Sequence, residues 1–325
     1  MQKPIMKKRL RRSPLEQDPG KRYGRFTIYG KTAQSTPRRT RADSPNKFRT
    51  KKSLGQHFLM HPSIAERIAD VANISSDDVV LEIGPGTGML TKPLLARAKK
   101  VIAIETDAEL IEKLPARFAD EIKNGWLTLI HGDIRDMRDT HLSLTVGNNK
   151  HYQVVANIPY YLTGEILRKF LSATHKPSSM TLLVQKEVAE RIVARKSARG
   201  GSASGGKESM LSVSVKAYGT PRYRFTVPRG AFVPAPKVDS AVISITDMRA
   251  DAFASPKEEK RFFDILHAGF AHKRKKLAGN LAVIAGREAA EQALRAAGIQ
   301  ENARPEDVSP PAWRLLAQAL SSKAS

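Results

Sequence analysis

The sequence contains no cysteine, and only 6% of its 325 residues are aromatic. The lack of cysteine excludes a disulfide framework, a thiolate metal site and a cysteine nucleophile. No run of 18 or more apolar residues occurs, which excludes a typical transmembrane helix. Acidic residues are also scarce, with 32 Asp and Glu against 55 Lys and Arg, so the formal net charge is +23. Such a charge predicts a polyanionic partner, and nucleic acid is the leading candidate.

The remaining composition is that of a folded protein. Hydrophobic residues make up 41% of the chain and charged residues 27%, which is enough apolar material for a packed core. A length of 325 residues exceeds what one core usually organises, so two domains are expected.

The positive charge is concentrated at the N-terminus. Residues 1–52 hold 17 Lys and Arg but only 3 acidic residues, with scattered Pro and Gly and no periodicity. We therefore predict that residues 1–46 form a basic disordered extension. It would serve as a phosphate-binding arm that orders on RNA or, less favoured, as an organelle transit peptide. Its removal should weaken RNA binding and leave cofactor affinity nearly unchanged.

Apolar runs predict most of the fold. Five predicted buried strands are 79–83, 101–104, 127–130, 152–156 and 180–184, and two more are 211–215 and 238–246. Predicted helices are 107–119, 186–195, 257–270, 287–297 and 311–320. The alternation indicates an α/β domain with a mainly parallel, doubly wound sheet at 47–247. A small α-helical domain should follow at 248–325.

A glycine-rich turn, Leu81-Glu-Ile-Gly-Pro-Gly-Thr-Gly88, follows the first predicted strand. Glycines permit a tight turn and close approach to a ligand, although the spacing Gly84-x-Gly86-x-Gly88 differs from the dinucleotide pattern. Glu105 ends the next strand and can accept hydrogen bonds from ribose hydroxyls, while Asp133 follows the third strand and could accept from an adenine amine. Together these residues favour a nucleoside cofactor and disfavour a nicotinamide oxidoreductase.

A second motif, Asn157-Ile-Pro-Tyr160, follows the fourth strand. The Asn157 side-chain oxygen and a carbonyl at the Pro159 turn can accept from an exocyclic amine, and the Tyr160 ring can stack on a base. Taken alone, the motif is equally consistent with a capping Asn, a turn Pro and a packing Tyr.

The two motifs together resemble those of class I, Rossmann-like methyltransferases that modify adenine N6. Three further segments narrow the resemblance: Ser53-Leu-Gly-Gln-His-Phe-Leu59, Leu183-Val-Gln-Lys-Glu-Val188 and Phe232-Val-Pro-Ala-Pro-Lys-Val-Asp-Ser240. Over residues 47–320 the chain resembles the small-subunit ribosomal RNA adenine dimethyltransferase family. His57 departs from the usual Asn of that family.

The resemblance implies an enzyme of ribosome biogenesis that dimethylates N6 of two adjacent adenines, in a hairpin loop near the 3′ end of small-subunit rRNA. S-adenosylmethionine would be the cofactor, bound by Gln56, His57, Leu59, Gly84, Gly86, Glu105, Asp133 and Asn157. The catalytic residues would be Asn157, Pro159, Tyr160 and Phe232, with Phe232 packing on the target base.

The expected partner is an immature 30S-type particle, bound by a monomer in the cytoplasm without a metal or a membrane. A mitochondrial or plastid location would follow if the N-terminus is a transit peptide. Lys273, Arg274, Lys275 and Lys276 are predicted to contact rRNA phosphates, rather than to form an ordinary solvated helix end.

Two alternatives remain open. One is a 23S rRNA adenine dimethyltransferase that confers macrolide-type resistance. The other is a non-catalytic RNA- or DNA-binding assembly or transcription factor on the same fold.

Overall fold

The structure is a computed structural model. It describes residues 22–23, 26–29, 55–146, 151–194, 206–272 and 274–321. Contacts divide the chain into two compact units: Met1–Gln185 with Arg224–Ser244, and Lys186–Tyr223 with Ile245–Ser325. None of the described helices is long and apolar enough to span a membrane.

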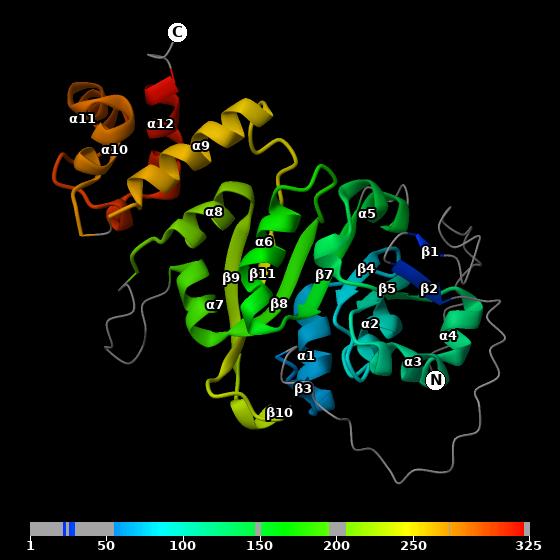
Figure 1. Cartoon of the computed structure of the whole chain (residues 1–325). Helices are drawn as coiled ribbons and strands as arrows, with labels where there is room; N and C mark the ends of the chain where they lie inside the picture. The colour runs from blue at the N-terminus through cyan, green and yellow to red at the C-terminus, as the bar shows by residue number, and fades with distance from the viewer. Residues whose placement is uncertain are drawn as a thin grey trace. The chain divides into compact units, whose positions relative to one another are not determined.

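The main sheet has nine strands in the order β1-β2-β6-β5-β4-β7-β8-β11-β9 (Figure 1). Its strands are β1 (Arg22–Tyr23), β2 (Phe26–Tyr29), β4 (Val79–Ile83), β5 (Lys100–Glu105), β6 (Leu127–His131), β7 (Tyr152–Asn157), β8 (Ser179–Gln185), β9 (Thr220–Val227) and β11 (Ser240–Thr246). The central pairs β6-β5, β5-β4, β4-β7 and β7-β8 are parallel, and β2 pairs antiparallel with β6. A separate antiparallel pair joins β3 (Phe58–Leu59) to β10 (Phe232–Val233). The predicted mainly parallel α/β sheet is confirmed.

Most helices of the first unit connect successive parallel strands. The helices are α1 (Pro62–Ala72), α2 (Thr91–Arg97), α3 (Ala108–Arg117), α4 (Ala119–Asn124), α5 (Asp139–Val146) and α6 (Thr163–Leu171), with short 3-10 turns η3 (Ile134–Asp136), η4 (Tyr160–Leu162) and η5 (Arg229–Ala231). Helix α3 follows strand β5, which ends at Glu105. Its N-cap Asp107 accepts a hydrogen bond from the backbone N–H of Glu109. Parallel order places the carboxyl ends of β4, β5 and β7 at one edge of the sheet, where ligands usually bind.

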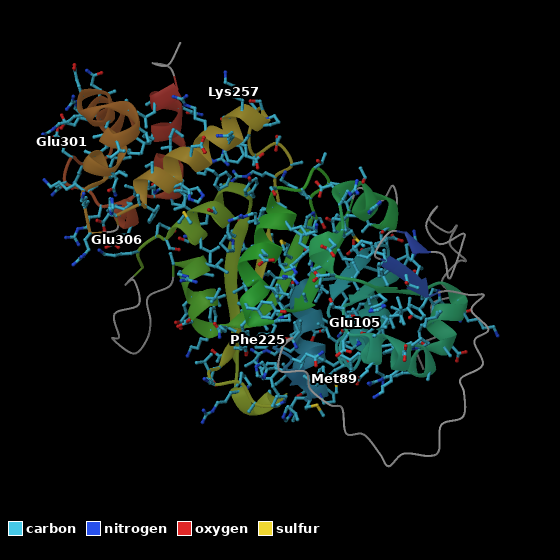
Figure 2. The ribbon with its side chains drawn as sticks, viewed as in Figure 1. Met89, Glu105, Phe225, Lys257, Glu301 and Glu306 are labelled. Carbon is cyan, nitrogen blue, oxygen red and sulfur yellow. The ribbon has the colours of Figure 1, made fainter. Side chains whose placement is uncertain are left out.

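The second unit is helical. Its elements are α7 (Lys186–Val193), α8 (Met210–Tyr218), α9 (Pro256–Gly269), α10 (Leu277–Ala285), α11 (Arg287–Ala296), η6 (Pro305–Asp307) and α12 (Pro310–Ser321). Trp313 is fully buried and stacks on Phe270, with 5.4 Å between ring centroids. A Cβ on Gly269 would lie 2.4 Å from the Trp313 ring, so this position requires glycine. Figure 2 shows two acidic residues of this unit, exposed Glu301 and partly buried Glu306, which pair with Arg295 and Lys207.

Two secondary-structure predictions were wrong. Residues 211–215 form part of helix α8, because Ser209 and Ser212 make a reciprocal capping box and tertiary packing buries Val213 and Val215. Within the segment predicted to be disordered, residues 26–29 form strand β2, because Phe26 and Ile28 bury their side chains against the sheet edge. Most of the remaining extension lies outside the described residues.

The division by contacts also differs from the expected domains. It places Lys186–Tyr223 with the C-terminal helices, and the second boundary falls at Ser244. The reason is that α8 packs on α9 and α12. The division at residues 247 and 248 stays a prediction.

Candidate active site

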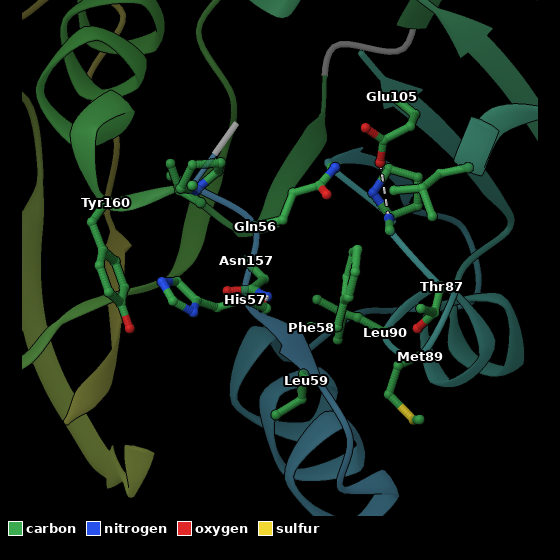
Figure 3. Close-up of a pocket in the computed structure, with 17 residues that line it drawn as sticks. Gln56, His57, Phe58, Leu59, Thr87, Met89, Leu90, Glu105, Asn157 and Tyr160 are labelled. Carbon is green, nitrogen blue, oxygen red and sulfur yellow. Dashed lines mark hydrogen bonds between the residues drawn. The ribbon is translucent and has the colours of Figure 1, made fainter. Parts of the chain in front are cut away.

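An open cavity lies at the carboxyl ends of β4, β5 and β7 (Figure 3). It encloses about 690 Å³, including solvent at its mouth. Its lining comes from four stretches of the first unit: Gly55, Gln56, His57, Phe58 and Leu59; Gly84, Pro85, Gly86, Thr87, Met89 and Leu90; Glu105 and Leu110; and Asn157, Ile158, Pro159 and Tyr160. Both motifs therefore face one cavity, as the strand order predicts.

The glycine turn is held in a conformation that glycine favours. Gly84, Gly86 and Gly88 have φ angles of +68°, +57° and +78°. A Cβ on Gly88 would lie 2.5 Å from the Phe118 ring, so a side chain here would displace packed neighbours. The turn thus presents backbone rather than side chains to the cavity.

Glu105 joins the glycine turn to the start of α3. Its carboxylate accepts hydrogen bonds from the backbone N–H groups of Gly86 (3.0 Å), Thr106 (2.9 Å) and Asp107 (2.9 Å). Burial raises the pKa of Glu105, and the three N–H donors oppose that rise. A carboxylate offers about four acceptor positions, so the carboxylate can still accept a bond from a ligand hydroxyl.

Glu82 lies two residues before the turn and is 1% exposed. Within the described part of the chain, neither carboxylate oxygen has a hydrogen-bond partner. Burial raises the pKa of Glu82 to about 8; the nearby Thr91 hydroxyl opposes this rise, and the charge of Glu105 adds to it. The side chain is therefore a neutral acid near neutral pH. Sequence analysis treated it only as part of the glycine motif.

The second motif is fixed by contacts with His57. The Asn157 Nδ2 donates to the His57 carbonyl oxygen at 3.2 Å, so the amide places its oxygen at the opposite end. The His57 Nδ1 lies 2.7 Å from the carbonyl oxygen of Pro234. Because a carbonyl only accepts, the Nδ1–H of His57 donates this hydrogen bond.

Tyr160 lies beside His57. The two rings stack with 5.6 Å between centroids and 26° between planes, and the Tyr160 hydroxyl lies 2.8 Å from the Ser240 Oγ. Burial raises the pKa of Tyr160. One face of its ring is already covered by His57, so a target base would have to stack on the other.

Gln56, another polar lining residue, lies between the two motifs (Figure 3). Its Nε2 donates to the Asp107 Oδ2 at 2.8 Å. This hydrogen bond joins the segment that contains Gln56 to the N-terminus of α3, on the side of the cavity where Glu105 lies.

Two predicted site residues do not line the cavity. Asp133 accepts from the Arg135 guanidinium at 2.7 and 3.0 Å and from its backbone N–H. Burial raises the pKa of Asp133, but the bonds and charge of Arg135 outweigh it and keep the pKa low. Phe232 pairs with Leu59 between β10 and β3 and is 3% exposed in the hydrophobic core. Its predicted packing on a target base conflicts with this burial.

Sequence analysis missed several apolar lining residues. Phe58 covers the glycine turn, since a Cβ on Gly86 would lie 3.2 Å from the Phe58 ring. Leu110, on the first turn of α3, and Met89 also face the cavity. Leu110 could have been found, because it is the first large apolar residue after the strand that ends at Glu105.

The predicted RNA-binding run belongs to the second unit. Lys273 lies outside the described residues, while Arg274, Lys275 and Lys276 are exposed. Lys276 is the N-cap of α10, so the charges precede the positive end of a helix dipole. The cations therefore lie in the loop between the end of α9 and the start of α10. Buried Asn280 fixes the loop by donating to the carbonyls of Gly269 and His272.

Comparisons with known proteins agree with this geometry. A ribosomal RNA small subunit methyltransferase A from Dehalococcoides mccartyi is 38% identical over 270 residues, covering 82% of this chain and 87% of the relative. Its counterpart in Shouchella clausii is 36% identical over 294 residues, covering 88% and 95%.

Two solved structures are similar over most of this chain. A dimethyladenosine transferase from Plasmodium falciparum has a TM-score of 0.66 and 26% identity, covering 82% of this chain and 98% of its own. The 23S rRNA methyltransferase ErmE has a TM-score of 0.63 and 26% identity, covering 81% and 99%. The pattern of the family described as ribosomal RNA adenine dimethylase matches residues 47–321. The chain therefore belongs to the ribosomal RNA adenine dimethylase family.

Proposed function

We propose that this enzyme transfers methyl groups from S-adenosylmethionine to N6 of two adjacent adenines, in a hairpin loop near the 3′ end of small-subunit rRNA. The closeness of the two motifs supports this most directly. Strands β4 and β7 pair with Ile83 beside Ala156, so Gly84 and Asn157 follow at the same edge. A Cβ on Gly84 would lie 3.8 Å from the Asn157 carbonyl oxygen. A cofactor on the turn and a base on the second motif would meet there.

The lining residues fit S-adenosylmethionine. The turn at Gly84 and Gly86 offers close backbone approach, Glu105 offers a carboxylate for ribose hydroxyls, and Phe58, Met89 and Leu110 offer apolar surface. When bound, the sulfonium of the cofactor supplies an activated methyl group. The protein then needs neither a covalent nucleophile nor a metal, and its main task is alignment.

Asn157 performs the alignment of the amine. Its Nδ2 bond to the His57 carbonyl leaves Oδ1 to accept an N6 hydrogen, and a carbonyl at the Pro159 turn accepts the other. Both bonds direct the N6 lone pair out of the ring system and toward the methyl group. The face of the Tyr160 ring that His57 leaves uncovered stacks on the base after it leaves the RNA stack, which costs a few kcal/mol.

The RNA itself is bound outside the cavity. The exposed cations Arg274, Lys275 and Lys276 contact phosphates of the rRNA. The partner is an immature 30S particle, and the enzyme acts on it as a monomer in the cytoplasm. Relatives that are 36–38% identical over most of this chain are named for the ribosomal small subunit. Their names favour small-subunit rRNA over 23S rRNA as the target.

A paired methylation assay tests the target. Labelled S-adenosylmethionine is supplied with 30S particles that lack the modification or with protein-free 23S rRNA. We expect two labelled dimethyladenosines per 30S particle and background incorporation into 23S rRNA. Exclusive use of 23S rRNA would support the resistance-type alternative suggested by the likeness to ErmE. RNA binding without S-adenosylmethionine binding in calorimetry would instead support a non-catalytic factor.

A further inference from the structure

Strand β2 lies ahead of the family's matched range, which begins at residue 47. It pairs with β6 in a defined register, Thr27 opposite His131 and Ile28 opposite Ile130. Phe26 and Ile28 face the core and are 6% and 4% exposed. Such burial fixes the strand to the edge of the catalytic sheet.

Phe26 occupies the space beside Gly132. A Cβ on Gly132 would lie 2.2 Å from the Phe26 Cδ1 and 2.6 Å from its Cε1. The Phe26 ring therefore lies where any other residue at position 132 would place its side chain. The same ring makes an edge contact with His141, with 6.5 Å between centroids. Gly132 is thus required by close approach of an aromatic ring.

Gly132 is in turn hydrogen-bonded to the end of strand β5, at the edge of the sheet where the cofactor is proposed to bind. Its N–H donates to the Glu105 carbonyl oxygen at 2.9 Å, and its own carbonyl accepts from the Thr106 Oγ1 at 3.3 Å. The next residue, Asp133, begins η3 by accepting from the Arg135 N–H. Phe26 therefore packs directly on the residue that connects Glu105 to Asp133.

We propose that β2, through Phe26, positions the turn at Gly132 and thereby sets the affinity for the adenosine half of S-adenosylmethionine. This inference rests on the proposed function. It makes Phe26 a positioning residue, contributed from outside the family's usual range. It also reverses the sequence-based expectation that residues 1–46 can be removed with little effect on cofactor affinity.

The test compares two core residues on the same face of β2. Phe26→Ala and Ile28→Ala each remove a buried side chain and should each lower the melting temperature by several degrees. We expect Phe26→Ala to raise the Kd of S-adenosylmethionine about 3- to 10-fold, a size usual for residues that act through a neighbour. Ile28→Ala should leave that Kd within about twofold of wild type. Calorimetry well below both melting temperatures measures the Kd.

A second pair of variants tests the contact itself. Gly132→Ala places a methyl group against Phe26 and should also weaken cofactor binding. The double variant Phe26→Ala/Gly132→Ala makes room for that methyl group. Its fold increase in Kd should therefore be smaller than the product of the fold increases of the two single variants. In steady state, Phe26→Ala should raise the KM for the cofactor and leave kcat near wild type.

The outcomes separate this inference from the proposed function. Equal Kd values for Phe26→Ala, Ile28→Ala and wild type would overturn the role of Phe26 and leave the methyltransferase assignment intact. If the effects of Phe26→Ala and Gly132→Ala on the free energy of cofactor binding simply add, the contact between these two residues is not the cause of the weaker binding. A wild-type protein that does not bind S-adenosylmethionine would contradict the proposed function itself.

Discussion

The cavity of the first unit and the basic loop of the second hold their functional groups in opposite ways. In the cavity, Glu105 is 6% exposed and accepts three backbone hydrogen bonds, and Asn157 is fixed by the His57 carbonyl. In the loop, the side chains of residues 274–276 are exposed, and only the backbone around them is fixed, by Asn280.

This difference fits the task proposed for each region. Alignment of an amine with a methyl group requires groups that do not reorganise during the reaction, so their hydrogen bonds are made in advance. Contact with a phosphate requires mainly positive charge within reach, and long flexible side chains supply it. Substitutions in the cavity should therefore have large effects on single steps, whereas those in the loop should have small and salt-dependent ones.

The largest effect is expected for Asn157→Ala. The variant loses the acceptor that orients N6, and loss of one preorganised hydrogen-bonding group costs about 10²- to 10³-fold in rate. Single-turnover methylation of 30S particles measures the rate, and a filter-binding assay serves as the control, since RNA affinity should stay near wild type. A normal rate in this variant would contradict the orienting role of Asn157.

Glu82→Gln should change the pH dependence of stability. The folded protein holds a proton on Glu82 up to about pH 8, while the unfolded chain releases it near 4.5. The stabilisation is thus complete below pH 4.5 and is lost as the pH rises toward 8. Because glutamine stays neutral, the variant should exceed wild type by roughly 4 kcal/mol at pH 8 and by little at pH 4.5.

Thermal unfolding of the protein without cofactor, followed from pH 4.5 to pH 8, measures this difference. Glu109→Gln is the matched control, because Glu109 is exposed and the same charge is removed. Parallel stability curves for wild type and Glu82→Gln would show that Glu82 ionises normally in the folded protein.

Much of this cavity could be predicted from the sequence because its chemistry is carried by local patterns. The apolar run before Gly84 marks a buried strand, and Glu105 and Asn157 each end another. Parallel strands end at a common edge, so three short patterns that are far apart in the chain were enough to predict one site.

The other features depend on partners far away in the sequence. Helix α8 carries an alternating pattern typical of a strand, and its capping box together with its packing on α9 and α12 makes it helical. The burial of Phe232 follows from its pairing with Leu59 across more than half of the chain. Likewise, strand β2 has four residues in a polar, basic segment, and nothing in them identifies β6 as the partner.

Glu105→Gln should have an intermediate effect. The amide replaces one acceptor oxygen with a donor, which then faces N–H groups of Gly86 or of the turn at Thr106. We expect the Kd of S-adenosylmethionine to rise about tenfold, corresponding to about 1.4 kcal/mol. Calorimetry measures it, and Glu109→Gln is again the control. An unchanged Kd would mean that the cofactor ribose is bound by another group.

The smallest effect is expected for the basic loop. The triple variant Arg274→Ala/Lys275→Ala/Lys276→Ala should weaken 30S binding several-fold and reduce the slope of log K against log salt by about 2. Filter binding over a range of salt concentrations measures both. The cofactor Kd should not change, because the loop contributes no residue to the cavity lining.

The control for this loop is a pair of cations whose charge is already compensated. Arg287 pairs with Glu291 and Arg295 with Glu301, both on the surface of the same unit. Since Arg287→Ala/Arg295→Ala removes charges that neighbouring carboxylates offset, its salt slope should stay closer to wild type than that of the triple variant. If both variants lower the slope in proportion to the charge removed, the second unit attracts RNA through its net charge alone, and the loop at residues 274–276 is no specific contact.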